Sequence, residues 1–400
     1  MNKTNITAGF LLIGILTASS MVPAATIRVE KWGANTPDCG AKDTPCADIQ
    51  HAIEERSSPN DRILVGPGHY EEAVVINNNS SGIALTGLKL ESTSGMHTTV
   101  IRTTLANTHG IAVHQPRVRI GKRGRGFTVG GAVSPGFAAI EVFAGADRVR
   151  IEGNRAILSD YGMIVRGEKS QVRYNVAESN NNLGFQCIDC NGGIIRLNQA
   201  RGNGDHGFQV SGSSGFSFDR NVLAYNMGGG AVVESNSDSY KLRDNVGEFN
   251  DSSGFAIAET DGSQVLGNIA LLNHDLGFIL NQSAYNKPPL IRNNAAIYND
   301  SVGIAAGNLV GARLDQNVAL DNATGIQFVA ASSYASITGN NTWGSASGCG
   351  IENNSGGPME YQRHFFGAAG VLDTVCGGIL PPGTEANRPN AFRANKAAKL

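Results

Sequence analysis

The most informative segment of this sequence is Asn175-Val176-Ala177-Glu178-Ser179-Asn180, followed by Gly184-Phe185. It holds two Asn residues five positions apart and a Gly nine positions after the first Asn. The same phrase returns with its first Asn at Asn198, Asn221, Asn245, Asn268, Asn294 and Asn317, and the last copy has its Gly at eight positions. Successive copies begin 23, 23, 24, 23, 26 and 23 residues apart. A short, nearly constant period dense in Asn and Gly is typical of a stacked repeat.

Apolar positions around the repeat predict short strands. The residue three before each first Asn is always apolar: Ile151, Val172, Ile195, Phe218, Leu242, Val265, Ile291, Leu314 and Ile337. Residues one and three after the Gly are apolar too, as in Phe185 and Cys187, which indicates one face of a strand. A unit of this length predicts one coil of a parallel β-helix. Aligned Asn side chains would then bond from coil to coil, because an unpaired buried amide costs roughly 1–3 kcal/mol.

The Asn-x4-Asn-x3-Gly repeat resembles the right-handed parallel β-helix repeat of the pectate-lyase-like superfamily. The segments Cys39–Ile53 and Ile63–Glu72 resemble the opening segment common in that group, so the resemblance covers about residues 39–340. It implies an all-β, single-stranded right-handed parallel β-helix, a solenoid of about 10–12 coils, with a short N-terminal capping helix and an irregular C-terminal cap. It does not imply one activity, because the superfamily includes lyases, hydrolases, epimerases, adhesins and proteins without known catalysis.

Composition divides the chain into five segments. Lys3, the apolar run Ala8–Ala18 and Val22-Pro23-Ala24 predict a signal peptide at 1–24, and therefore a periplasmic or secreted protein. We expect an N-terminal cap with a helix at 25–76, the β-helix at 77–340, a C-terminal cap at 341–379 and a flexible tail at 380–400. No apolar run is long enough for a membrane span.

The six cysteines all follow the predicted cleavage point. An even number in an exported chain favours disulfides, and pairing of near neighbours is the simplest arrangement: Cys39 with Cys46, Cys187 with Cys190, and Cys349 with Cys376. The Cys187-x-x-Cys190 spacing also occurs in redox and zinc sites. Its inward apolar position and the lack of a second Cys/His pair favour a disulfide or two buried thiols.

Charge is polarised along the chain although the formal net charge is only −2, which excludes a generally basic nucleic-acid-coating protein. Residues 117–243 hold 16 Lys+Arg and 11 Asp+Glu, a net of +5, whereas residues 244–340 hold 3 and 9, a net of −6. Two residues before each first Asn runs the row Glu152, Arg173, Arg196, Asp219, Arg243, Leu266, Arg292 and Asp315. Arg173, Arg196, Lys241 and Arg243 are the predicted substrate-binding residues, because Arg grips carboxylates bidentately. The alternative is a solvated strand face without a ligand.

Catalytic residues are harder to assign. Asp205-His206 and His274-Asp275 each place an imidazole beside a carboxylate, a pairing suited to acid–base catalysis. They lie three coils apart, roughly 14 Å, and could not form one site. Of the Asp-Pro-His-Asp signature of alginate epimerases only His274-Asp275 is present, and Asp is also an ordinary turn residue. Calcium would be expected only for a lyase, and no metal ligands are assigned.

Two hypotheses remain. The protein is an exported enzyme acting on an acidic polysaccharide, as a lyase or epimerase, or it is a non-catalytic glycan-binding or surface-structural β-helix. A further expectation concerns Leu271, Ile297 and Leu320, which would form an apolar strip on the late coils. Residues 341–380 or a second copy of the chain would cover this strip, so self-association is predicted.

Overall fold

The computed structural model describes residues 23–234, 237–258, 261–281, 287–329, 332, 336–347, 349–355, 360–362, 365–366 and 374–376. The predicted signal peptide, apart from residues 23 and 24, and the predicted tail at 380–400 lie outside these residues. In the described part, no helix is long and apolar enough to cross a membrane.

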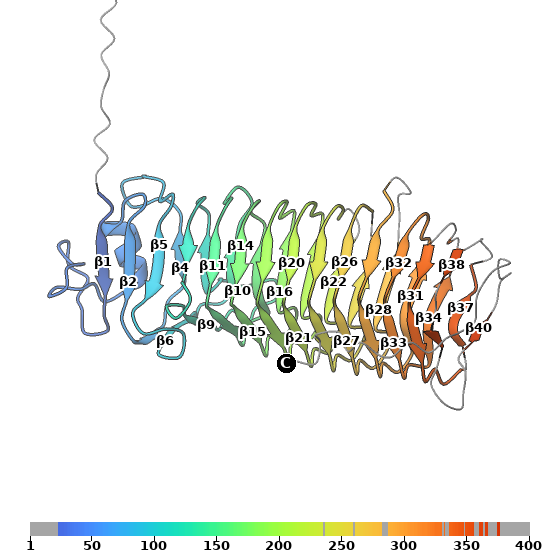
Figure 1. Cartoon of the computed structure of the whole chain (residues 1–400). Helices are drawn as coiled ribbons and strands as arrows, with labels where there is room; N and C mark the ends of the chain where they lie inside the picture. The colour runs from blue at the N-terminus through green and yellow to red at the C-terminus, as the bar shows by residue number, and fades with distance from the viewer. Residues whose placement is uncertain are drawn as a thin grey trace, which may run out of the picture.

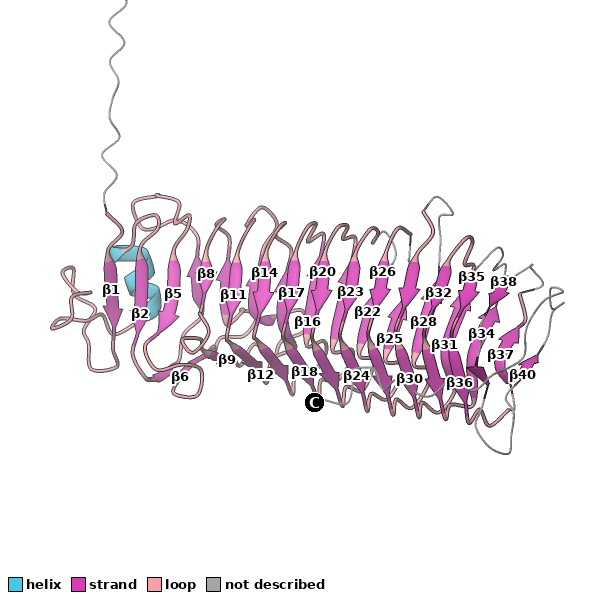
Figure 2. Ribbon diagram, in the orientation of Figure 1, coloured by secondary structure: helices cyan, strands magenta, loops and turns pink. Residues whose placement is uncertain are grey.

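The chain winds into coils that each contribute one strand to three parallel sheets, as Figure 1 and Figure 2 show. Sheet A contains β1 (Thr26–Val29), β2 (Arg62–Val65), β5 (Lys89–Ser92), β8 (Arg119–Ile120), β11 (Arg150–Glu152), β14 (Gln171–Arg173), β17 (Ile194–Arg196), β20 (Ser217–Asp219), β23 (Lys241–Arg243), β26 (Gln264–Leu266), β29 (Leu290–Arg292), β32 (Arg313–Asp315), β35 (Ser336–Thr338) and β38 (Glu360–Gln362).

Sheet B contains β3 (Gly68–Tyr70), β6 (Thr99–Arg102), β9 (Thr128–Gly130), β12 (Arg155–Ile157), β15 (Val176–Glu178), β18 (Gln199–Arg201), β21 (Val222–Ala224), β24 (Val246–Glu248), β27 (Ile269–Leu271), β30 (Ala295–Ile297), β33 (Val318–Leu320), β36 (Asn341–Trp343) and β39 (Phe365–Phe366). Sheet C contains β4 (Val74–Ile76), β7 (Ile111–Val113), β10 (Ala138–Val142), β13 (Tyr161–Val165), β16 (Phe185–Ile188), β19 (Phe208–Ser211), β22 (Ala231–Val233), β25 (Phe255–Ile257), β28 (Phe278–Asn281), β31 (Val302–Gly307), β34 (Thr324–Val329), β37 (Cys349–Asn353) and β40 (Thr374–Cys376).

The core is a stack of like positions, and the predicted inward positions are confirmed. Val172, Ile195 and Phe218 pair in register on neighbouring strands and are all buried. Phe185 stacks on Phe208 of the next coil with ring centroids 5.6 Å apart. Each coil therefore buries its apolar side chains against the equivalent side chains above and below.

Two Asn ladders hold the coils in register. Asn245 is typical: its Nδ2 donates to Phe218 O at 2.9 Å and to Asn268 Oδ1 at 2.9 Å. Its Oδ1 accepts the backbone N–H of Asn221 at 2.9 Å and the Asn221 side-chain amide at 3.0 Å. The second ladder has the same geometry, as between Asn250 and Asn273. Every buried amide is thus satisfied, which confirms the structural role predicted for the repeat.

A short helix covers the N-terminal end of the stack (Figure 1). It begins as α1 (Ile49–His51) and continues as a π-helical turn, η1 (Ala52–Arg56), so the predicted helix is present but shorter. The Glu72 carboxylate accepts the N–H groups of Ile49 at 2.9 Å and Gln50 at 2.8 Å. Burial raises the pKa of Glu72, and these two hydrogen bonds oppose the rise. The carboxylate satisfies donors that a helix start leaves unpaired.

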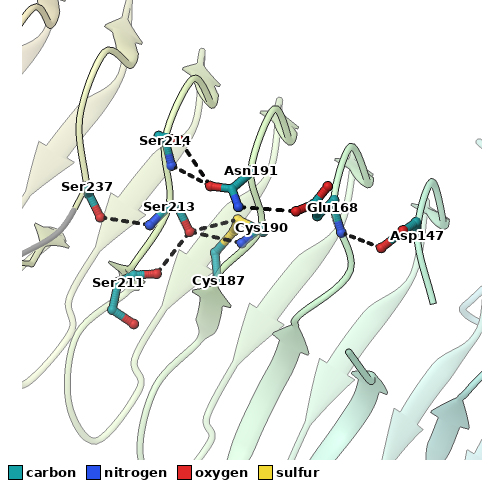
Figure 3. The surroundings of a disulfide bond; sticks show 9 residues. All are labelled: Asp147, Glu168, Cys187, Cys190, Asn191, Ser211, Ser213, Ser214 and Ser237. Atoms are coloured by element: carbon teal, nitrogen blue, oxygen red, sulfur yellow. Dashed lines mark hydrogen bonds between the residues drawn. A yellow bond between two sulfur atoms is a disulfide. The ribbon is translucent and has the colours of Figure 1, made fainter. Parts of the chain in front are cut away.

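All three near-neighbour disulfides are formed, Cys39–Cys46, Cys187–Cys190 and Cys349–Cys376. Figure 3 shows the Cys187–Cys190 bridge in the turn between β16 and β17, where Cys190 N donates to Ser213 Oγ at 3.0 Å. Both sulfur-bearing residues are buried, which agrees with a structural bridge.

The ends of the β-helix differ from the expected boundaries. Sheet A begins at β1 and β2, ahead of residue 77, because these strands already pair in parallel register. At the other end, β36 and β37 pair with β33 and β34, so the three sheets continue beyond Asn340. The sequence period becomes irregular there, but backbone pairing needs no particular side chain.

Candidate functional site

The predicted basic row lies on the outer face of sheet A. Glu152, Arg173, Arg196, Asp219 and Arg243 pair in register on successive strands. Lys241 lies in the parallel outward row, opposite Ser217. The structure therefore brings the four predicted substrate-binding residues onto one face.

Asp219 neutralises part of this row. Its buried carboxylate lies 2.9 Å from Arg196 Nε, 3.0 Å from Arg243 Nε and 3.1 Å from Arg220 Nε. The Asp219 carboxylate also raises the pKa of Arg243. Arg173 differs, because it forms no ion pair with a carboxylate among the described residues, whereas Arg196 and Arg243 both pair with Asp219. The row thus keeps a net positive charge, with Arg173 and Lys241 the cations least engaged by the protein.

The two predicted His–Asp pairs are far apart, as expected, and differ in geometry. His206 Nε2 lies 3.5 Å from Asp205 Oδ1, and its Nδ1 accepts Gly229 N–H at 2.6 Å. Both ring nitrogens of His206 therefore have partners. His274 Nδ1 lies 3.3 Å from Asp251 of the preceding coil instead of from Asp275. Burial raises the pKa of Asp275. Neither pair presents a free imidazole nitrogen beside a second catalytic group.

A different cluster, which the repeat pattern does not reveal, lies on the outer face of sheet C. The Glu141 carboxylate on β10 is buried, with Oε1 3.0 Å from Arg166 Nε and Oε2 3.1 Å from His109 Nδ1. His109 precedes β7 and Arg166 follows β13, so three consecutive coils meet at one carboxylate. The Arg166 side chain is 35% exposed, which leaves its outer guanidinium face open to a ligand.

Two groups face His109 Nδ1, and each of them would favour a different tautomer of the ring. The nitrogen lies 3.1 Å from Ala138 N as well as 3.1 Å from Glu141 Oε2. A protonated Nδ1 donates to Glu141 and leaves Nε2 as a free base, whereas an unprotonated Nδ1 accepts from Ala138. Burial lowers the pKa of His109, partly opposed by the Glu141 charge. Only the tautomer with Nδ1–H is a neutral imidazole held by a carboxylate with Nε2 free, which is the arrangement that a general base requires; that tautomer gives up the hydrogen bond from Ala138 N–H.

Tyr161 lies at the start of β13, one coil beyond Glu141, and pairs in register with Ala138. Its hydroxyl oxygen accepts Asn182 Nδ2–H at 3.1 Å. Burial raises the pKa of Tyr161, and the Asp160 and Asp205 carboxylates add to the rise. Tyr161 therefore stays protonated and can donate a proton.

Aromatic rings border the cluster. His114, which follows β7, stacks on Phe143 with ring centroids 4.1 Å apart. Phe143 also meets His109 edge-on at 5.6 Å, and Phe137 lies 4.9 Å from the same imidazole. These rings limit the access of water to His109 and offer apolar surface to a sugar ring.

The backbone positions of His109 and Tyr161 are related by the register of sheet C. His109 and Tyr161 occupy the same row of sheet C, with β10 between their strands, so they stand two coils or about 10 Å apart. Their environments hold His109 neutral and Tyr161 protonated. Two titratable groups whose pKa values are displaced in opposite directions are a recognised sign of an acid–base pair.

Metal binding finds no support in the side-chain arrangement. Within the described ranges, no group of three or more His, Cys, Asp or Glu is placed to hold a metal ion.

Comparison with known proteins places the chain by its architecture. The family described as "Right handed beta helix region" matches residues 136–270, and the family described as "Periplasmic copper-binding protein (NosD)" matches residues 213–361. No curated protein sequence matches the chain.

Among solved structures, the A-module of the Azotobacter vinelandii mannuronan C-5 epimerase AlgE4 is similar, with a TM-score of 0.59 and 17% identity over 85% of this chain and 95% of that one. The periplasmic alginate epimerase AlgG gives 0.54 and 17% over 80% and 82%. The GH87 α-1,3-glucanase of Streptomyces thermodiastaticus gives 0.64 and 14% over 89% and 70%.

These identities are low, so the likeness concerns the fold. It agrees with the three-sheet parallel stack described above. The chain is a right-handed parallel β-helix repeat protein.

Proposed function

We propose that this protein acts on an acidic polysaccharide by removing the proton next to a uronate carboxylate, as a C5 epimerase or a lyase. The observation that carries this proposal is the His109–Glu141–Arg166 constellation, with Tyr161 two coils away. It combines a neutral base, a cation for the substrate carboxylate and a proton donor on the far side.

The chemistry follows from these positions. Arg166 pairs with the substrate carboxylate and lowers the energy of the enolate that forms when the C5 proton leaves. His109 Nε2 takes that proton while Nδ1–H donates to Glu141, and the C–H electron pair enters the C5–C6 bond.

Two outcomes are then open to the enolate. Tyr161 returns a proton to the opposite face of C5, which gives the epimer, and the tyrosinate is reprotonated from solvent. Alternatively the electrons expel the O4-linked sugar, Tyr161 protonates the leaving oxygen and a C4–C5 double bond remains. The basic row on sheet A, with Arg173, Arg196, Lys241 and Arg243, provides further sites for carboxylates.

The comparisons support this proposal at the level of fold and named chemistry. Two of the similar structures are called mannuronan or alginate epimerases, whose substrates are uronate polymers. The three disulfides support export, because such bonds persist in oxidising compartments, and a similar structure and a matching family are both named periplasmic.

A non-catalytic glycan-binding protein is the second candidate. It is favoured by the sheet A cations, which lie outside the acid–base cluster and would bind a polyanion without transforming it. The two functions share a ligand class and differ only in turnover.

One experiment separates them. The purified protein is incubated with polymannuronate, polygalacturonate and a glycosaminoglycan, with calcium or with a chelator. Absorbance of the unsaturated product detects a lyase, and incorporation of solvent deuterium at C5 detects an epimerase. Turnover that His109→Gln abolishes would support the enzyme; binding without either product on any of these polymers would leave the non-catalytic function.

A further inference from the structure

A basic edge lies beside the sheet C cluster, in the turn that leads from sheet C to sheet A. Arg117, Arg148 and Lys169 occupy equivalent positions in three consecutive coils. Arg117 N donates to Asp147 O, and Arg148 N donates to Glu168 O, both at 2.8 Å. In each case the acceptor is the residue before the next cation, so the side chains are one coil apart, about 5 Å. These are the three coils that supply His109, Glu141 and Arg166.

The backbone at this edge is unusual for long charged residues. Arg117, Arg148 and Lys169 have φ values of 62°, 57° and 54°, in the left-handed region that disfavours residues with a Cβ. The next two coils have Gly192 and Gly215 at the same position, with φ values of 65° and 64°. Three coils therefore keep a cation at a position where the next two coils have glycine, although positive φ itself recurs in the turns of other coils, as at Tyr174, Leu197 and Ser239.

The three cations are available to a ligand. All three are exposed, and none forms an ion pair with a described residue. Their acidic neighbours are engaged along the edge: Asp147 Oδ1 accepts Glu168 N–H at 3.0 Å, and Glu168 Oε1 accepts Asn191 Nδ2–H at 3.3 Å (Figure 3). Two residues further on, Arg119 and Arg150 pair in register on sheet A; Arg119 Nη1 lies 3.7 Å from Glu91 Oε1, and Arg150 extends the positive surface.

Other paths away from the cluster carry no such charge. Along sheet C, the positions after Arg166 in the next three coils are Ile188, Ser211 and Glu234. On the opposite edge, between sheets B and C, lie Asp160, Asp205 and Asp251. An anionic polymer held at Arg166 would meet uncharged or acidic surface in both directions. Only the edge toward sheet A matches its charge.

We infer that Arg117, Arg148 and Lys169 form a binding site for the flanking anionic groups of a carboxylated or sulfated polysaccharide, which crosses the coil edge from sheet C to sheet A. This inference rests on the proposed function for the class of ligand. It adds the place and direction in which the polymer leaves the acid–base cluster.

The test replaces all three cations by glycine, as Arg117→Gly, Arg148→Gly and Lys169→Gly in one chain. The glycines suit the local φ, so the thermal unfolding midpoint should not fall. Affinity for polymannuronate and polygalacturonate should drop about tenfold or more, with a weaker dependence on salt. Tyr298→Gly is the matched control: Tyr298 has φ 53°, is exposed and lies in the late coils, and its replacement should leave binding unchanged.

A gain of binding provides the reverse test. Gly192→Lys extends the basic edge by one coil, and a Cβ there would meet only Lys169 Cγ at 3.4 Å. Affinity for the same polymers should rise while the unfolding midpoint falls, because the new side chain is strained. Affinity for dextran, which is neutral, should be the same for the wild-type protein and for all variants.

The outcomes separate the inference from the proposed function. Unchanged polymer affinity in the triple-glycine variant, or no binding of either polymer by the wild-type protein, would overturn the inference. In the first case His109→Gln can still abolish turnover, and the proposed function would stand. Weakened binding by the triple variant together with no turnover by the wild type would support the edge and leave a non-catalytic protein.

Discussion

His109 Nδ1 lies 3.1 Å from Glu141 Oε2, although the two residues are separated by a whole coil of the β-helix. The carboxylate is 5% exposed and the imidazole 14% exposed, so water competes little for this contact. Glu141 also holds Arg166 at 3.0 Å. One buried carboxylate thus orients both the proposed base and the proposed carboxylate-binding cation, and several expectations depend on it.

Replacement of the carboxylate should disable the cluster. Glu141→Gln keeps the shape but removes the charge that stabilises Nδ1–H of His109 and positions Arg166. We expect turnover to fall about 100-fold or more, the range usual for loss of a general base. The His109 pKa, followed by NMR, should fall further, since the Glu141 charge raises it in the wild type. Glu168→Gln, an exposed control, should change neither quantity; an unaltered His109 pKa in Glu141→Gln would contradict the contact.

The pH dependence should follow the two displaced groups. Catalysis needs neutral His109, whose pKa burial lowers, so the acidic limb of the rate profile should lie below 6.5. The raised pKa of Tyr161 places loss of the proton donor above 10. An acidic limb above 6.5, or one that persists unchanged in His109→Gln, would exclude His109 as the base.

Folding stability should respond to the same histidine. Between the lowered pKa of His109 and 6.5 the unfolded chain binds more protons than the folded chain, so the free energy of unfolding decreases as pH falls through this window. Denaturant titrations at several pH values should show that the free energy of unfolding depends less steeply on pH in His109→Gln than in the wild type. An equal dependence on pH in both proteins would mean that His109 has the same pKa in the folded and the unfolded chain.

Removal of one Asn from a ladder should destabilise the protein by more than the loss of its side-chain volume alone would. Asn245→Ala removes acceptors for two Asn221 donors and a donor to Phe218 O, all buried. We expect a loss of about 2–4 kcal/mol in the free energy of unfolding, because each buried unsatisfied group costs about 1–3 kcal/mol. Exposed Asn293, which precedes the ladder residue Asn294, is the control: Asn293→Gly keeps its positive φ and should change stability by less than about 0.5 kcal/mol.

The sheet A row can be tested through the acid that neutralises it. Asp219→Asn removes a buried charge that Arg196, Arg220 and Arg243 share. If this face binds polyanions, as predicted, their affinity should rise in Asp219→Asn and fall in the double variant Arg173→Ala/Arg196→Ala. If polymer affinity is unchanged in both variants, the sheet A row does not bind the polymer and is a solvated strand face.

The apolar strip predicts self-association. Leu271, Ile297 and Leu320 pair in register on the outer face of sheet B and are partly exposed, with Trp343 next in the row. Light scattering over a range of concentrations should show a dimer that Ile297→Glu converts to a monomer. A wild-type protein that is monomeric throughout would end this prediction.

The repeat could be predicted because it is local and periodic. Each ladder position must carry the same Asn, and each inward position must be apolar, so Asn175 and Ile195 reveal their environment by recurrence. The near-neighbour disulfides also follow from their short separations. The cap boundaries could not be predicted as well, because β36 and β37 continue the sheets with side chains that break the period.

The acid–base cluster could not be predicted in the same way. Ile111 pairs with Ile140, 29 residues later, whereas Ile140 pairs with Met163, 23 residues later, so no single period aligns these coils. His109, Glu141 and Arg166 also differ in type, and unlike residues leave no periodic signal. To find this cluster from the sequence, one would have to search for His, Glu and Arg in successive coils of variable length.

The solenoid can be predicted from the sequence, because stacking requires similar residues at equivalent positions, and these residues recur at a nearly constant interval. The sequence also determined which charges lie on the outer face of sheet A. The proposed acid–base cluster depends on the three-dimensional fold, because winding of unequal coils places His109 and Arg166 around the buried Glu141 carboxylate. The same winding places the basic edge of Arg117, Arg148 and Lys169 beside this cluster. Neither the cluster nor the edge recurs at a fixed interval in the sequence.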